Sequence, residues 1–130
     1  MSRTCVTRLD SKGRIVIPGG FRGFLRLKPD SRVLVSLDRR GGKLVITPVL
    51  EKRLVALRIG LSDAPGSLAR AAKALAETGV DLVSTESRSV SRGNTAEWLV
   101  FCSVDSVKSL DAVKKRVLAS GAKTFSARSL

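Results

Sequence analysis

The chain lacks histidine and tyrosine, and it has only two cysteines, Cys5 and Cys102. Without imidazole, histidine-based acid–base chemistry, Ser-His-Asp and Cys-His arrangements and histidine-ligated zinc are excluded. Two cysteines so far apart form neither a metal cluster nor a disulfide framework, so we interpret both as buried, reduced thiols. Paired carboxylates at a pocket-like spacing and a phosphate-binding loop are also missing. We therefore expect a protein that is not an enzyme and holds no cofactor or metal.

Long apolar runs are missing as well. None approaches the roughly 20 residues needed to span a bilayer, and no charged segment followed by an apolar stretch opens the chain. We therefore expect a cytoplasmic protein with no membrane partner. The chain has one asparagine, Asn94, and no glutamine. Such scarcity is typical of a thermophile source, although the base composition of the genome gives the same result.

Acidic residues are scarce. The chain has 24 Lys and Arg residues but only 11 Asp and Glu residues, which gives a net charge of +13. Residues 1–53 carry thirteen basic and four acidic side chains, and so hold a net +9 of that charge. This asymmetry favours a polyanion as the partner of the first segment, with nucleic acid ahead of a membrane surface. A basic, soluble protein without such a partner is the alternative. Hydrophobic residues make up 43% of the 130 residues, enough for a packed core.

The first 48 residues predict a small, mostly β unit. The expected elements are strands at 4–9 and 14–18, a short helix at 19–27, and strands at 32–37 and 43–48. Residues 10–13 (DSKG) have the composition of a turn between the first two strands, and the helix places Arg22 and Arg26 four residues apart. Because so small a unit cannot bury a sufficient core alone, we expect two copies to interleave into one barrel.

This segment resembles the AbrB/MazE/SpoVT-type swapped-hairpin β-barrel. The signature consists of Asp10, Gly13-Arg14, Ile17-Pro18, Arg22 and the Lys28–Asp30 turn. The resemblance implies an intertwined homodimer that binds double-stranded DNA. The positions that match the basic positions of the family are Arg8, Lys12, Arg14 and Arg22, and helical spacing adds Arg26. The sequence departs from the family pattern at Gly19, Gly20 and Gly23.

Residues 54–130 follow a linker at 49–53 and predict the order β-α-β-β-α-β. The expected elements are strands at 54–61, 80–91, 96–104 and 123–128, a first helix between Asp63 and Gly79 with the apolar face Leu68, Ala71, Ala72 and Leu75, and a second helix capped by Asp105 or Ser106 and stopped by Gly121. Trp98, Val100, Cys102 and Val104 share one strand face. We therefore expect two helices on one face of an antiparallel, ferredoxin-like sheet, and an α+β fold for the whole chain.

The second unit resembles the ACT domain, a small-molecule regulatory module of amino-acid metabolism. Its marks are Asp63-x-Pro65-Gly66-x-Leu68 at the start of the first helix and Gly79-Val80-Asp81-Leu82 at the start of the next strand. The resemblance implies domains paired edge to edge with effectors at their interface, and an effector site formed by Asp63, Ala64, Pro65, Gly66, Ser67, Leu68, Asp81 and Leu82.

The chemistry expected at that site follows from the residues. A helix N-terminus offers free N–H groups to a carboxylate, and Asp63 or Asp81 can accept an ammonium group. Asp81 stands where many ligand-binding members have asparagine, so it keeps the acceptor and loses the amide donor. Two alternatives stay open: a helix-capping loop without a ligand, and the related effector module of leucine-responsive regulators.

Three functions compete at this point. The leading hypothesis is a transcriptional regulator that binds double-stranded DNA as a barrel homodimer, forms higher oligomers through the ACT-like unit and senses an amino acid there. The second is an antitoxin, although antitoxins with this barrel usually carry a disordered tail where this chain has a patterned unit. The third is a regulatory subunit of an amino-acid enzyme, which leaves the basic segment unexplained.

Overall fold

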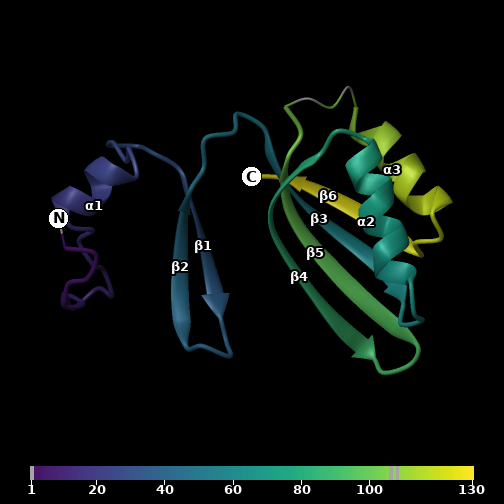
Figure 1. The fold of residues 1–130 in the computed structure, drawn as a ribbon, viewed down its shortest axis with the longest axis horizontal. Helices are drawn as coiled ribbons and strands as arrows, with labels where there is room; N and C mark the ends of the chain where they lie inside the picture. Colours follow the sequence, from purple (N-terminus) through teal and green to yellow (C-terminus); the bar gives the residue numbers. More distant parts are fainter. Residues whose placement is uncertain (1, 106, 108) are drawn as a thin grey trace. The chain divides into compact units, whose positions relative to one another are not determined.

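A computed structural model describes residues 2–105, 107 and 109–130. These residues form two compact units, and the boundary between them falls between Leu50 and Glu51. We call them unit 1 and unit 2 and describe each by itself (Figure 1). The predicted linker, residues 49–53, spans the boundary.

Unit 1 contains the helix α1 (Gly19–Phe24) and the strands β1 (Val33–Asp38) and β2 (Lys43–Pro48). The two strands form the predicted antiparallel hairpin, in a register that pairs Val33 with Pro48. Helix α1 is shorter than expected, since Leu25 already caps it and Arg26 has a positive φ of 56°. The prediction that Arg22 and Arg26 lie on one helical face is therefore wrong: Arg26 lies beyond the end of the helix.

The two strands predicted at 4–9 and 14–18 do not form in the described chain, although the turn between them does. The N–H of Gly13 donates to the carbonyl of Asp10 at 3.1 Å, and the N–H of Asp10 donates to the carbonyl of Arg14 at 2.9 Å. Gly13 has a φ of 74°, as the third loop residue of a three-residue hairpin turn requires. A strand is stable only when its backbone groups are paired, and the two arms beyond this turn lack a neighbouring strand among the described residues.

Unit 2 has the predicted β-α-β-β-α-β order. Its elements are β3 (Leu54–Ser62), α2 (Ser67–Glu77), β4 (Asp81–Ser91), β5 (Thr95–Ser103), α3 (Leu110–Ala119) and β6 (Thr124–Ser129). The four strands form one antiparallel sheet in the order β4-β5-β3-β6, and both helices cover the same face of that sheet (Figure 1). Strands β4 and β6 are therefore the two edges of the sheet.

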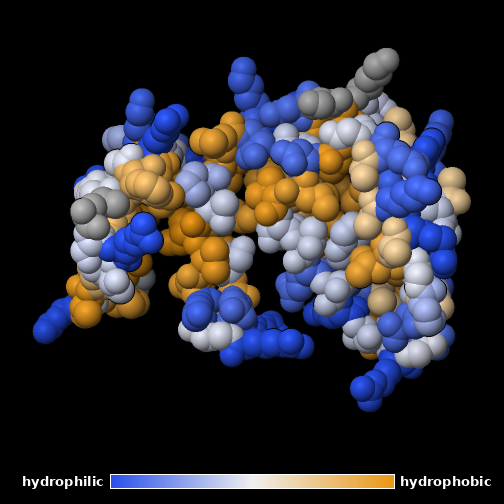
Figure 2. All heavy atoms as spheres, viewed as in Figure 1, coloured by the Kyte–Doolittle hydropathy of each residue, from blue (hydrophilic) through white to orange (hydrophobic). Residues whose placement is uncertain are grey.

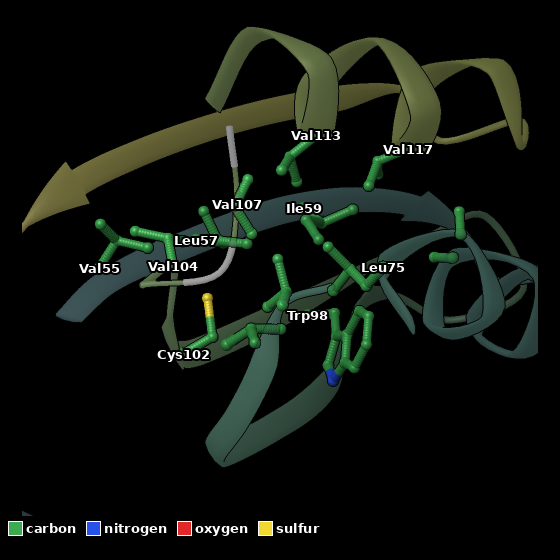
Figure 3. Packing of buried hydrophobic residues seen from close by; sticks show 14 of the residues in the cluster. Val55, Leu57, Ile59, Leu75, Trp98, Cys102, Val104, Val107, Val113 and Val117 are labelled. Carbon is green, nitrogen blue, oxygen red and sulfur yellow. The ribbon is translucent and has the colours of Figure 1, made fainter. Parts of the chain in front are cut away.

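The core of unit 2 lies between the sheet and its helices (Figure 3). Alternate residues of β3 and β5 point inward and meet the apolar faces of α2 and α3. The fully buried members with the largest side chains are Leu57, Ile59, Leu75, Val100, Cys102, Val104, Val113 and Val117. Leu68 is an exception to the predicted apolar face of α2, since it is 41% exposed. Among the described residues, every buried hydrophobic side chain belongs to unit 2.

The N-terminus of α3 differs from its prediction. Ser109 caps the helix, and its Oγ accepts a hydrogen bond from the N–H of Ala112 at 3.1 Å. Asp105 instead accepts the N–H groups of Arg53 at 2.8 Å and Lys52 at 3.2 Å, so its carboxylate holds the start of unit 2. The other predicted cap, Ser106, lies outside the described residues.

Candidate functional site

The first half of the predicted effector site is the loop from Asp63 to Leu68, between β3 and α2. Gly66 occupies the N-cap of α2 with a φ of 87°, a left-handed conformation that favours glycine. Because glycine has no side chain, no side-chain oxygen caps the first turn of this helix. Ala64, Pro65 and Gly66 are exposed, whereas Ser67 is buried. The loop thus presents the uncapped N–H groups of a helix N-terminus, which favour a carboxylate or another anion.

Asp63 forms hydrogen bonds within unit 2. Its carboxylate accepts the N–H of Gly93 at 2.7 Å and the hydroxyl of Ser89 at 3.3 Å, and its own N–H donates to the carbonyl of Asn94 at 3.2 Å. These bonds attach the β3–α2 loop to the turn between β4 and β5. Asp63 therefore supports the loop, and its side chain does not cap α2.

The second half of the predicted site, Asp81 and Leu82, lies at the start of β4. Both residues are exposed, and Asp81 pairs with Ser103 of β5. Ser103 pairs in turn with Leu54, the first residue of β3. The loop at Asp63 follows the last residue of that same strand, so the two halves lie at opposite ends of the sheet. One chain does not bring them together.

Three of the five basic residues predicted to bind DNA, Arg8, Lys12 and Arg14, lie around the Asp10–Arg14 turn of unit 1. One oxygen of Asp10 accepts the N–H groups of Lys12 and Arg14, each at 2.9 Å, while the other accepts Nε of Arg14 at 2.7 Å. The backbone bond from Arg14 and then the bond from its side chain lower the pKa of Asp10. The carboxylate thereby fixes the turn, and the side chains of Arg8, Lys12 and Arg14 are all exposed.

The two remaining predicted DNA contacts belong to α1 and the residues after it. Arg22 is exposed, and its Nε donates to the carbonyl of Ile17 at 3.0 Å, so the helix is connected to the arm that follows the turn. Arg26 is exposed as well. Both of these arginines and the three basic residues at the turn are thus accessible on unit 1, and Arg14 forms an exposed ion pair with Asp10.

Unit 1 also exposes hydrophobic side chains (Figure 2). Val6 is completely exposed, and Leu9 and Val16 are exposed by 70% and 75%. Between the arms, α1 and β2 lies a hollow of about 300 Å³ lined mostly by apolar residues, among them Ile15, Ile17, Phe21, Leu25, Leu44 and Ile46. A soluble protein rarely leaves so many apolar side chains in water, which indicates that another surface covers them.

Sequence reasoning missed two contacts that shape these sites. It predicted the strands at 80–91 and 96–104 on either side of the turn but did not foresee that Gly93 and Ser89 bind Asp63. It also missed the attachment of Lys52 and Arg53 to Asp105. Both contacts join segments far apart in sequence, and no local pattern encodes such partners. The abundance of serine in β4 was the sequence feature that could have indicated the contact with Asp63.

The comparisons with known proteins identify one family. The family model of the ACT domain matches residues 55–119, which is half of the chain. No curated protein matches the chain. In the described part of the chain, no helix is both long and apolar enough to cross a membrane. Within the same residues, no group of three or more His, Cys, Asp or Glu side chains is placed to hold a metal ion.

Proposed function

The chain belongs to the ACT domain family, and from this membership we propose that it is a regulator that senses an amino acid through unit 2 and binds double-stranded DNA through unit 1. The ACT domain supports the sensing role, because such domains bind small amino-acid effectors and often oligomerise. The net charge of +9 on residues 1–53 supports the DNA-binding role. No catalytic reaction is part of the proposal.

The geometry of unit 2 supports an effector site that two copies share. The Asp63–Leu68 loop and the Asp81-Leu82 segment lie at opposite ends of one sheet. When two β4 edges pair antiparallel, the start of one strand lies beside the end of the other. Such pairing brings the α2 N-terminus of one subunit to Asp81 of the partner subunit. An amino acid then meets N–H groups with its carboxylate and the carboxylate of Asp81 with its ammonium group.

The observation that carries the DNA-binding role is the charge of the first segment combined with its geometry. Residues 1–53 hold a net charge of +9. The Asp10 carboxylate orders a turn that holds Lys12 and Arg14 in exposed positions, and α1 adds Arg22. Guanidinium groups donate two parallel hydrogen bonds to phosphate oxygens and reach guanine edges in the major groove. A duplex therefore fits this surface better than a small anion does.

A second copy of unit 1 completes this proposal. The arms on either side of the Asp10–Arg14 turn expose Val6 and Val16 and lack strand neighbours in the described chain. If the arms of two copies exchange, they provide each other with the missing ladder and fill the apolar hollow beside α1. The swapped-hairpin barrel is thus the arrangement that meets both needs, and it doubles the basic surface offered to DNA.

A titration with fluorescent duplex DNA tests the DNA-binding role. We expect Lys12→Glu in the full chain to weaken binding at least tenfold, because a dimer loses two phosphate contacts and gains two repulsive charges. Lys123→Glu, which makes the same charge change in unit 2, serves as the matched control and should change binding much less. Equal effects of both variants would mean that binding depends on the net charge of the chain and not on the basic surface of unit 1. Absence of binding by the wild type at low salt would exclude DNA as the partner, and co-purification with an enzyme would then favour the regulatory-subunit hypothesis.

A thermal-shift screen with the twenty amino acids tests the sensing role. A ligand at 100 times its Kd stabilises the folded state by about 2.7 kcal/mol, which raises the Tm by several degrees. We expect Asp81→Ala to abolish that shift. Asp111→Ala removes another exposed carboxylate of unit 2 and should leave it intact. A shift that survives Asp81→Ala would place the amino acid elsewhere.

A further inference from the structure

One face of the sheet in unit 2 carries no helix, because α2 and α3 both cover the other face (Figure 1). We call it the open face. An antiparallel sheet usually places polar side chains on such a face, and strand β5 departs from that rule. Trp98, Val100 and Cys102 belong to the core, yet Leu99 and Phe101, which alternate with them, are apolar as well and lie half-buried on the open face. Two neighbouring apolar side chains at this position indicate a contact surface.

A hollow of about 390 Å³ lies on the open face over β5, β3 and β6. We call it the open-face hollow. Leu99 and Phe101 line it from β5, and Ala56 lines it from β3. Ala56 is paired with Phe101 on one side and with Arg128 of β6 on the other, so its short side chain leaves space between two larger ones. Small-ligand sites have volumes in this range and combine an apolar lining with a few polar groups.

The polar side chains that line the open-face hollow are two arginines and one serine. Arg58 of β3 is paired with Ser126 of β6, and Arg128 follows two residues later on the same face of β6. Diagonal neighbours on paired strands lie roughly 7–8 Å apart, so the long side chains of Arg58 and Arg128 can reach one bound anion. Among the described residues that line the hollow, none is acidic.

The positive charge at the open-face hollow is only partly balanced. Nε of Arg58 lies 3.7 Å from one oxygen of Glu97, and Arg88 donates to the other oxygen at 3.1 Å, so two guanidinium groups share one carboxylate. Glu86, the other carboxylate of this face, is on β4, the opposite edge of the sheet from Arg128. Arg128 is exposed and forms no ion pair with another described residue. An anion with an apolar group complements this combination of charge and apolar lining.

We propose that the open-face hollow binds a small aromatic carboxylate. Arg128 and Arg58 donate N–H groups to its two oxygens, since a planar guanidinium matches a carboxylate in two parallel hydrogen bonds. The aromatic ring packs against Leu99 and Phe101, because apolar and aromatic side chains favour such contact. A cationic group finds no acidic partner in the lining, so this ligand differs from the amino acid proposed for the effector site.

This second site is independent of the functions proposed above. None of its lining residues belongs to the Asp63–Leu68 loop or to the Asp81-Leu82 segment. It also lies on the face of the sheet opposite to α2, whose N-terminus is part of the predicted effector site. Failure of the sensing or DNA-binding experiments therefore leaves this inference intact, and its own failure leaves those roles intact.

Three ligands of the same ring and different charge test the chemistry. We expect benzoate to shift the backbone amide signals of β3, β5 and β6 in NMR spectra of the full chain. Benzamide, its neutral counterpart, should bind at least tenfold more weakly, because it offers no negative charge to the guanidinium groups. Benzylamine, which is cationic, should not shift these signals. Absence of benzoate binding at millimolar concentrations, or equal binding of benzamide, would overturn the proposal.

Two substitutions test the open-face hollow itself. Ala56→Leu fills the space between Phe101 and Arg128 without a change of charge, and Arg128→Gln removes the guanidinium that lacks an ion pair. Each should weaken benzoate binding at least tenfold, while the dispersion of the amide signals shows that the fold is kept. Ala112→Leu and Lys123→Gln make matched changes at exposed positions outside the hollow and should leave binding unchanged. Wild-type affinity in Ala56→Leu and Arg128→Gln would overturn the site.

Sedimentation of Ala56→Leu separates a bound carboxylate from a second copy of the chain as the occupant of the open face. With a carboxylate as the occupant, the variant should keep the mass of the wild type, because the substitution affects no contact between subunits. A lower mass would overturn the proposal, since it would show that another copy of the chain covers this face.

Discussion

At the scale of single residues, the two cysteines differ in their surroundings. The sequence predicts that both are buried, and this is confirmed for Cys102 but wrong for Cys5, which is exposed. Burial raises the pKa of the Cys102 thiol to about 11. Cys5 belongs to an arm that no other part of the described chain covers, and local hydrophobicity does not reveal such a lack of cover.

The Cys102 thiol should therefore be protected in the native protein. At pH 8 in native buffer, we expect a thiol reagent to leave Cys102 unlabelled, because a buried, protonated thiol is a poor nucleophile. Both cysteines should react in denaturant. The measurement is the labelling of each cysteine by mass spectrometry, with Cys5→Ser as the variant that leaves Cys102 as the single thiol. Rapid labelling of Cys102 in the native state would contradict its packing.

Asp105 is the second residue whose role can be tested alone. Hydrogen bonds from the N–H groups of Arg53 and Lys52 lower its pKa. Since the folded-state pKa lies below the unfolded one, this stabilisation is present above about pH 4 and is lost as the pH falls through the folded value. The free energy of unfolding of the wild type should therefore exceed that of Asp105→Asn at pH 7, and the difference should shrink below pH 4. A difference independent of pH would contradict the role of the carboxylate.

At the scale of elements, hydrophobic alternation and turn residues were sufficient to predict most of the helices and strands of unit 2. The strand at 54–61, the helix that ends before Gly79 and the hairpin around residues 92–95 all form close to their predicted positions. Each of these elements has a clear residue pattern of its own. The elements that it packs against in unit 2 have equally clear patterns. The strands at 4–9 and 14–18 were predicted on equally good patterns and do not form. Strand formation depends on a partner, and residue patterns do not say whether that partner belongs to the same chain.

Helix α2 provides a matched test of the packing. Leu75 is fully buried between the helix and the sheet, whereas Leu68, on the same helix, is 41% exposed. Leu75→Ala should lower the free energy of unfolding by about 2–5 kcal/mol, because it removes buried methyl groups and leaves a cavity. Leu68→Ala should lower it by less than about 1 kcal/mol. Chemical denaturation measures both, and similar losses would contradict the observed face of the helix.

At the scale of the whole molecule, the two units differ in how they can be stable. Unit 2 has a core between sheet and helices, while no hydrophobic residue described in unit 1 is fully buried. The charge distribution and the residue patterns predicted two segments of different character. They could not identify the surface that packs against unit 1, because no pattern within residues 1–50 encodes the partner of that surface.

A single substitution in an arm tests whether a second copy covers unit 1. Val16 is 75% exposed in the chain, so Val16→Asp should have little effect on an isolated monomer. In an entwined barrel the same change buries a carboxylate without a partner, and that is strongly unfavourable. We expect the variant to lose unit 1 assembly and, with it, the tight binding to a fluorescent duplex that needs the doubled basic surface. A variant that binds the duplex like the wild type would contradict the exchange of arms.

The salt dependence of DNA binding tests the central claim most directly. If each subunit of a dimer neutralises about four phosphates, the eight contacts predict that the logarithm of the binding constant falls against the logarithm of salt concentration with a slope of roughly −7. The measurement is the affinity of the full chain for a fluorescent duplex at several salt concentrations. A slope near that value is the predicted result. A slope near zero, or no binding at low salt, would contradict the assignment of the basic unit 1 to DNA.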